Sequence, residues 1–177
     1  MGNRTLKIAL LVMLPLLALL CGTTFALMFR QTEALDNRFE PAAVTCEIAE
    51  SFDGTTKSTI TVRNTGTIDA YLRVRLVTYW VDSGGNILAG TPSVPGFSLG
   101  ANWISGGENT YYYKTPVPPG GSTGNLLGSS ISLAQDAETG RYQVIEVFAD
   151  AIQSNPGEAV TESWGVTLSG GSITAAP

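Results

Sequence analysis

The sequence predicts an all-β fold preceded by an N-terminal leader helix. Two segments carry this prediction, residues 59–82 and residues 141–153, because apolar and polar side chains alternate along both with the period of two that is typical of strands. A third observation is compositional: glycine and threonine are abundant, and runs with helical periodicity are scarce. The segments around the two strands are therefore expected to be shorter strands and turns.

Residues 1–26 have the pattern of a signal peptide. Arg4 and Lys7 form a positively charged start, an apolar run follows, and Thr24 and Ala26 place small residues where a signal peptidase would cut. We expect cleavage near Ala26. The alternative is a retained membrane anchor, because the apolar run counted on to Phe29 would make a helix of about 33 Å, enough to span a hydrocarbon core of about 30 Å.

Residues 27–43 form a polar arm behind the leader. Leu35 and Phe39 are apolar residues spaced four apart within it, and Val44 follows at the start of the first predicted strand. We assign these three residues to assembly, because an extended arm can add as a donor strand to the sheet of a neighbouring subunit. A mobile N-terminus explains the same composition equally well.

Residues 44–168 form the predicted β-domain. The segment 44–52 alternates as the first strand, and Asn64–Gly66 supplies the turn inside residues 59–82. Residues 141–153 are apolar on both faces, so we expect this strand to lie centrally in its sheet. The other predicted elements are a hairpin over 81–88, a strand over 111–114, a weaker strand over 126–133, a helical turn over 158–162, a final strand over 164–168 and a flexible tail over 169–177.

Asp82 and Asn86 flank two glycines in the predicted hairpin and form a weak calcium candidate, since hard cations take carboxylate and carbonyl oxygens. The spacing does not match an EF-hand loop, and one carboxylate is a poor ligand set. A plain turn is the favoured interpretation, and we predict no metal and no cofactor.

Four aromatic residues are candidates for a binding surface: Phe97 and Trp103 in the long loop over residues 89–110, and Tyr111 and Tyr113 in the strand that follows. Exposed rings in such a loop can stack on sugars or fill a partner's pocket. The alternative, which is the more common arrangement, is that they close one end of the β-domain.

Cys46 loses its potential partner Cys21 when the leader is removed. A single cysteine on a strand is most simply a small buried hydrophobic residue. An exported protein leaves a second interpretation open, in which the thiol pairs with another molecule.

Composition excludes several classes of function. The chain contains no histidine, which removes Ser-His-Asp and Cys-His catalysis, the HExxH zinc helix and imidazole metal sites. The formal charge of −5 becomes −7 without Arg4 and Lys7, and an acidic surface does not suit nucleic acid. We therefore predict that the protein is not an enzyme and that it contacts a membrane only through an uncleaved leader.

An ordered set of segments carries a family resemblance. They are the leader end Gly22–Ala26, then Val62–Val74, Trp80–Asp82 with Asn86, Tyr111–Lys114 followed by Pro118–Ser122, and Val147–Gln153 before Trp164 and Gly165. In this set the chain resembles the TasA/camelysin-like proteins of Gram-positive bacteria, which are exported with the specialised SipW-type signal peptidase and found in biofilm matrix.

The resemblance implies a jelly-roll-like antiparallel β-sandwich, secretion, and assembly into extracellular fibres by donor-strand exchange, with the arm behind the leader as the donor. Some members of the family are described as metallopeptidases. That activity is not carried over, because this chain has no histidine to bind zinc.

The favoured function is therefore a secreted structural protein of the extracellular matrix or cell surface that self-assembles as a homo-oligomer or fibre. The alternative is an extracellular module that binds carbohydrate or a surface protein through the four aromatic residues named above.

Overall fold

The computed structural model describes residues 2–4, 7–17, 41–136 and 138–177, and the chain divides into two compact units, residues 1–40 and 41–177. In the first unit, residues 7–17 form an exposed apolar helix, as predicted for the leader. The expected cleavage region near Ala26, and Leu35 and Phe39 of the arm, lie outside the described residues. No described helix has the length and apolar character needed to cross a membrane.

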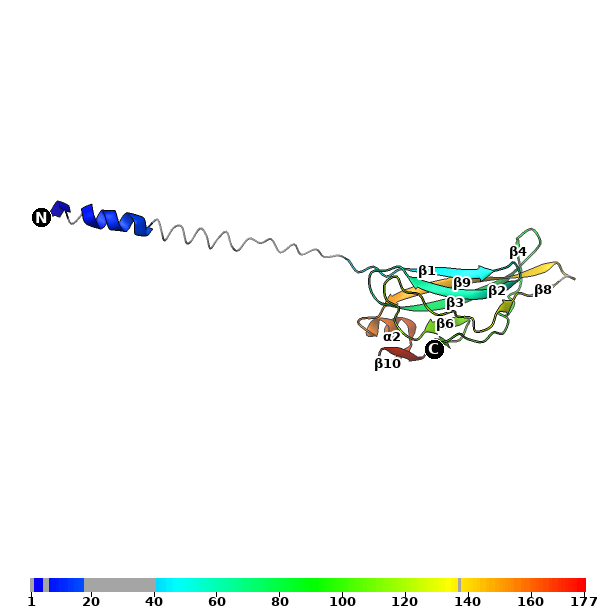
Figure 1. Cartoon of the computed structure of the whole chain (residues 1–177). Helices are drawn as coiled ribbons and strands as arrows, with labels where there is room; N and C mark the ends of the chain where they lie inside the picture. The colour runs from blue at the N-terminus through cyan, green and yellow to red at the C-terminus, as the bar shows by residue number, and fades with distance from the viewer. Residues whose placement is uncertain (1, 5–6, 18–40, 137) are drawn as a thin grey trace. The chain divides into compact units, whose positions relative to one another are not determined.

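Residues 41–177 fold as antiparallel sheets, so the all-β prediction is confirmed (Figure 1). A three-stranded sheet has the order β1-β2-β7 and a six-stranded sheet has the order β5-β6-β3-β9-β8, with β4 added to the end of β3. The bounds are β1 Cys46–Phe52, β2 Thr56–Asn64, β3 Ala70–Val81, β4 Ile87–Leu88, β5 Trp103–Ser105, β6 Thr110–Tyr113, β7 Ile131–Ser132, β8 Gln135–Asp136 and β9 Arg141–Gln153.

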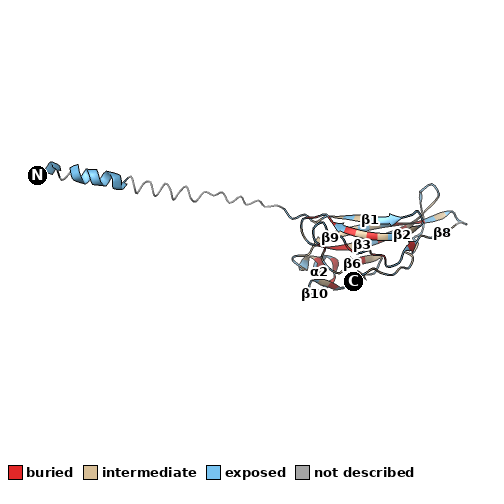
Figure 2. Cartoon of the chain, viewed as in Figure 1, coloured by how far each residue is buried: buried red, intermediate tan, exposed pale blue. Residues whose placement is uncertain are grey.

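The spine of the large sheet is the β3–β9 pair, formed by the two segments whose alternation is clearest in the sequence. Their register runs without interruption from Ala70 opposite Gln153 to Val81 opposite Tyr142. Alternate residues of both strands face the small sheet and form the core, which appears red in Figure 2. Members that are at most 2% exposed are Ile60 and Val62 of β2, Leu72, Val74 and Leu76 of β3, Ile145 of β9, and Val117, Leu126 and Ile131.

The turn predicted at Asn64–Gly66 is present and is fixed by the buried Asn64 side chain. Its Nδ2 donates to the carbonyl oxygens of Ile68 (2.8 Å) and Val117 (2.7 Å), and its Oδ1 accepts from the Gly66 N–H (2.9 Å). Gly66 is needed because a Cβ there would overlap the carbonyl oxygen of Ala43. Glycine is needed at this position because another backbone segment approaches closely, and its φ is not positive.

The C-terminal part covers the outer face of the large sheet and corrects one prediction. We expected residues 169–177 to form a flexible tail, but Ser172–Ala175 form β11, which pairs with β10 (Thr167–Ser169). Ile173 is 1% exposed and its N–H donates to the Lys114 carbonyl (2.8 Å). A second apolar cluster forms around it, containing Tyr71, Tyr112, Val160, Trp164 and Val166.

The helical turn predicted over 158–162 is α2, Glu158–Trp164. Gly165 ends it in the left-handed conformation (φ 67°), where glycine is the favoured residue. Trp164 therefore belongs to the helix, and the predicted strand over 164–168 begins only at Thr167. The ring of Trp164 packs against Tyr112, with 5.7 Å between ring centroids.

The edge of β2 that faces away from β1 is closed by an irregular segment. Thr123 exchanges two hydrogen bonds with Val62, through its own N–H and its Oγ1 (2.9 and 3.0 Å). Asn125 Oδ1 accepts from the Ile60 N–H (2.8 Å), and the Leu126 N–H donates to the Ile60 carbonyl (2.8 Å). The strand predicted over 126–133 is therefore confined to β7, because side chains supply much of the pairing before it.

Candidate functional site

On the opposite side of the molecule both sheets end in strand edges. β1 is the terminal strand of the small sheet, and β8 pairs with β9 only at Arg141 and Tyr142. Within residues 41–136 and 138–177, no strand pairs with the outer edge of β1. Beyond Gln143, β9 pairs with β3 on one edge and, in the same ranges, with no strand on the other. The prediction that residues 141–153 lie centrally is thus wrong for most of this strand, because one neighbour is only two residues long.

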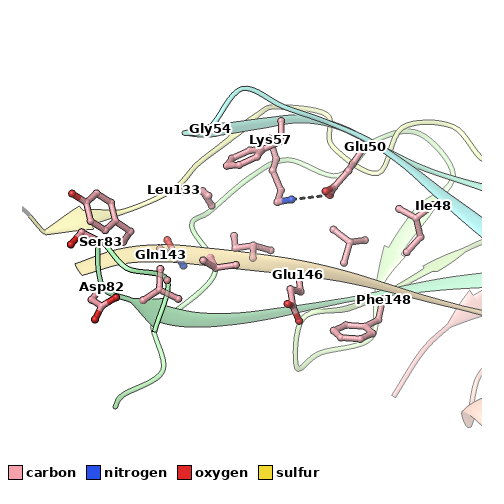
Figure 3. Close-up of a pocket in the computed structure, with 17 residues that line it drawn as sticks. Ile48, Glu50, Gly54, Lys57, Asp82, Ser83, Leu133, Gln143, Glu146 and Phe148 are labelled. Carbon is pink, nitrogen blue, oxygen red and sulfur yellow. Dashed lines mark hydrogen bonds and ion pairs between the residues drawn. The ribbon is translucent and has the colours of Figure 1, made fainter. Parts of the chain in front are cut away.

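A groove of about 1070 Å³ lies between these two edges. Its lining is mostly apolar and comes from the inner face of β1 and β2 on one side and from β9 on the other. Figure 3 shows Ile48, Glu50 and Lys57 extending toward β9, whereas Glu146 and Phe148 leave β9 on its far side. The lining residues are Ile48, Glu50, Phe52, Gly54, Lys57, Val81, Asp82, Ser83, Gly85, Leu133 and Tyr142–Phe148.

A partly buried ion pair lies in the groove. The Lys57 side chain is 5% exposed, its Nζ lies 2.8 Å from Glu50 Oε2, and it sits 4.9 Å from the centroid of the Phe52 ring. The Glu50 side chain is 39% exposed and reaches the open side of the groove. The groove therefore holds one desolvated ammonium among apolar neighbours.

A β-bulge explains why a lysine points inward here. In the β1–β2 ladder Ser51 lies opposite Thr59, but Phe52 lies opposite Lys57, so Ser58 is the extra residue. The bulge shifts the alternation by one residue and places Lys57 on the same face as the core residue Ile60. Sequence analysis missed Lys57 and Glu50 because strict alternation puts Lys57 on the outer face.

Exposed apolar side chains gather around the groove. In the described part of residues 41–177, the large hydrophobic residues more than a third exposed are Phe52, Val77, Ile87, Tyr142 and Phe148. Phe52, Tyr142 and Phe148 line the groove itself, and Val77 lies opposite Glu146 on the outer face of the same sheet. Clustered exposed hydrophobic residues mark interaction surfaces more reliably than scattered ones.

The four aromatic candidates do not form a surface. Trp103 is 4% exposed and its Nε1 donates to the Gly124 carbonyl (3.0 Å). Its ring packs edge-on against Tyr113 (5.2 Å between centroids), and Phe97 packs against Tyr111 (5.4 Å). The rings therefore pack on the core at one end of the sandwich, which is the alternative considered above. Phe97 and Tyr111 also line a second, smaller pocket of about 270 Å³, so their assignment as binding residues stays a prediction.

Asp82 and Asn86 form a self-contained turn at the mouth of the groove. Asp82 Oδ1 accepts from the N–H groups of Gly84 (2.8 Å) and Asn86 (2.9 Å), and Asn86 Nδ2 donates to Asp82 Oδ2 (3.0 Å). The Asn86 side-chain and backbone hydrogen bonds lower the pKa of Asp82. The carboxylate is therefore engaged within its own turn, and the described residues contain no cluster of three or more Cys, Asp and Glu that could hold a metal.

The remaining sequence candidates lie where β1 begins. Val44 is half-buried, and the carbonyl oxygens of Ala43 and Thr45 accept from the N–H groups of Thr67 (2.9 Å) and Thr65 (3.0 Å). Cys46 is half-buried too, and burial, followed by the negative charge of Asp150, raises the pKa of its thiol. The segment entering β1 is thus fixed to the sandwich, and β1 and β9 approach each other at this end.

Comparison with known proteins adds no identity: no family model, no curated protein sequence and no solved structure matches the chain. The fold and the site together define an antiparallel β-sandwich with one closed side and one open side.

Proposed function

We propose that the protein is an exported structural protein that assembles outside the cell, with residues 27–43 of one copy added as a strand to the groove of the next. The observation that carries the proposal is the groove itself, which lies between the unpaired edges of β1 and β9. An incoming strand satisfies the backbone N–H and C=O groups of an edge, and pockets for its alternate side chains give specificity.

The dimensions of the groove and the arm agree. Residues 144–152 of β9 extend over about 30 Å, a length that an extended segment of the arm can match. In such a strand Leu35 and Phe39 face the same side, so both can enter the apolar groove. Val44 lies at the junction between arm and sandwich.

The attachment of the arm favours a neighbouring copy over the same chain. Ala43 and Thr45 are hydrogen bonded to residues 65–67, at the end of β1 farthest from Phe52. To reach its own groove the arm would have to reverse direction and run back along β1. A donor from a second copy has no such turn to make.

Export is supported by the sequence of the first unit. Arg4 and Lys7 lie at the start of an apolar segment that is helical over residues 7–17, and the small residues Thr24 and Ala26 follow it in the sequence. The resemblance to the TasA/camelysin-like proteins supports the same location, in biofilm matrix or at the cell surface. Carbohydrate binding is not proposed, because Trp103 and Tyr111 are buried, and Phe97 and Tyr113, half-buried, pack against the core.

The test compares protein beginning at residue 27 with protein beginning at residue 41. The longer form is expected to form large assemblies, and the shorter form is expected to remain monomeric, as measured by light scattering and negative-stain electron microscopy. A synthetic peptide of residues 27–43 should bind the shorter form and raise its melting temperature. The same peptide with Leu35→Asp and Phe39→Asp is the matched control.

Equal assembly of both forms would contradict the proposal. So would a longer form that stays monomeric at high concentration.

A further inference from the structure

We propose that the uncovered end of the outer face of the large sheet is a contact surface for a second copy of this chain. Two such surfaces meet face to face about a two-fold axis. The contact is separate from the groove and uses no residue of the arm, so it can be tested independently of the proposed function.

The outer face of the large sheet is covered at one end and open at the other. The C-terminal part covers the end that holds Tyr71 and Tyr112, where Ile173 is 1% exposed. At the open end, Val77 and Phe148 are 39% and 45% exposed. We call the open end the outer patch, and it consists of Arg75, Val77 and Tyr79 of β3 and Val144, Glu146 and Phe148 of β9.

The two charged side chains of the outer patch are not paired with each other. Arg75 is exposed and makes no hydrogen bond or ion pair with residues 41–136 or 138–177. Glu146 is exposed as well, and its Oε1 accepts from the Tyr79 hydroxyl (2.8 Å), whereas its other oxygen accepts no hydrogen bond in the same ranges. The outer patch thus presents a guanidinium and a carboxylate oxygen that are both available to another molecule.

The register of β3 and β9 places these charges at opposite corners of the patch. Arg75 lies opposite Phe148, and Val77 lies opposite Glu146. One diagonal of the patch therefore carries the two charges, and the other carries the two apolar side chains.

A two-fold axis along the apolar diagonal makes this arrangement self-complementary. The axis runs between two facing patches, so that Val77 meets Val77, Phe148 meets Phe148, and Arg75 of each copy meets Glu146 of the other. With about 4.8 Å between strands and about 6.6 Å between alternate residues, the strands of the two sheets cross at about 70°. This angle is near the orthogonal class of sheet packing.

The charges are what favour a second copy as the occupant. A patch with two charges of one sign would repel its copy, whereas this patch offers each charge its opposite across the axis. The charge pairs fix the orientation of the contact, and the apolar pairs exclude water between them.

A single contact of this kind is weak. The outer patch has six residues, whereas a stable interface takes about 20–30 residues from each partner. Protein without the arm therefore stays monomeric in dilute solution and forms the contact only transiently. Copies held in a fibre repeat the contact many times, so neighbouring fibres should lie side by side.

The first experiment traps the contact in protein beginning at residue 41. Val77→Cys is made in a Cys46→Ser background and oxidised with copper phenanthroline at high protein concentration. Because Val77 lies on the axis, we expect several times more disulfide-linked dimer than from Ile87→Cys in the same background. Ile87 is 73% exposed and lies outside the outer patch, so it measures random collision. Equal dimer from the two positions overturns the proposal.

Charge reversals test the orientation. Arg75→Glu and Glu146→Arg, each added to Val77→Cys, should lower the dimer yield to that of Ile87→Cys, because like charges then face each other. An equal mixture of the two variants should restore the yield as mixed dimers, identified by their mass. Both positions are exposed, so both variants should fold, which circular dichroism checks. A mixture that yields no more dimer than either variant alone overturns the two-fold contact.

Protein beginning at residue 27 separates this inference from the proposed function. Its fibres should lie side by side in negative-stain electron micrographs, and Arg75→Glu should leave them single without shortening them. Fibres of the unmodified protein that lie singly overturn the contact and leave the proposed function standing. Failure to form fibres overturns the proposed function alone, because the disulfide yields do not involve the arm.

Discussion

The two lateral sides of the sandwich differ in how their strand edges are treated: one side is covered and the other is open. On one side, the edge of β2 is occupied by Thr123, Asn125 and Leu126, which supply both backbone and side-chain hydrogen bonds. On the other side, the outer edge of β1 and most of the outer edge of β9 lack a strand partner within the described residues, and a groove separates them. The contrast shows that an irregular segment of this chain can cover a strand edge. The outer edges of β1 and β9 are therefore open although the chain can form such a cover elsewhere.

Large apolar side chains are buried on the closed side and partly exposed on the open side. Leu126 and Ile131 on the closed side are fully buried, whereas Phe52 and Phe148 on the open side are 47% and 45% exposed. Exposed edges in natural proteins are usually protected by charge, proline or twist, because they invite unwanted pairing. The two open edges carry the charges of Glu50 and Glu146, yet Phe52 and Phe148 stay exposed beside them, which is consistent with the strand addition proposed above.

The largest expected effect comes from the closed side. Leu126→Ala should lower the free energy of unfolding by about 2–5 kcal/mol, because it opens a cavity at a fully buried position. Phe148→Ala on the open side should change it by no more than about 0.5 kcal/mol. Urea unfolding of protein beginning at residue 41 measures both, and equal losses would show that the two sides do not differ.

Asn125→Ala should lower the free energy of unfolding by about 1–3 kcal/mol, because the Ile60 N–H loses its acceptor and the Ser58 carbonyl loses a donor. Asn125→Asp keeps an acceptor for Ile60 and should lose less. Faster hydrogen exchange at the Ile60 amide in the alanine variant would identify the opened edge. Unchanged exchange there would show that the side chain does not seal β2.

Replacing one or the other partner of the ion pair in the groove should change the free energy of unfolding by different amounts. Glu50→Gln leaves the Lys57 ammonium without its carboxylate and should cost about 1–2 kcal/mol, less than for a fully buried pair because Glu50 is 39% exposed. Lys57→Met replaces the ammonium by an apolar chain and should be neutral or stabilising. Thermal unfolding of both variants makes the comparison, and a larger loss in Lys57→Met would contradict it.

A smaller effect is expected from the turn at the mouth of the groove. The hydrogen bonds from Asn86 hold the pKa of Asp82 below its usual value of 3.8. A carboxylate with a lowered pKa stabilises the folded state above pH 3.8, and this contribution is lost as the pH falls through the lower folded value. Asp82→Asn and Asn86→Ala should both flatten the loss of stability in acid, measured by urea unfolding between neutral pH and pH 2.

The smallest effect concerns the thiol where β1 and β9 approach each other. Burial, and then the charge of Asp150, raise the pKa of Cys46, so the reactive thiolate is rarer than in an unfolded chain. A thiol reagent at pH 8 should therefore label folded protein more slowly than protein in urea, and Asp150→Asn should speed the folded reaction slightly. Equal labelling rates in folded and unfolded protein would show that the Cys46 thiol is fully accessible in the folded state.

Local patterns in the sequence predict the elements of this fold but not its open side. The strands β3 and β9 follow from alternation, and the turns at Asn64–Gly66 and Asp82–Asn86 follow from residue types that hydrogen bond within a few positions. β11 was missed because Ile173 is a single large apolar residue whose buried neighbours, Tyr71 and Tyr112, lie far earlier in the chain.

The candidate site depends on features that alternation cannot encode. Whether a strand has a neighbour on each side is a property of the whole sheet, so the apolar character of β9 suggested burial where the structure leaves an edge. The burial of the four aromatic residues depends on how the loop over residues 89–110 packs on the core, which local patterns do not show.

The bulge at Ser58 has one more consequence. A single additional residue in β2 decides whether a solvated hydroxyl or an ammonium group faces the interior beside Phe52. In a regular ladder of the same sequence Phe52 would lie opposite Ser58, and Lys57 would face the outer side. Strand register, rather than side-chain replacement, therefore decides which polar group faces the seam between the two sheets.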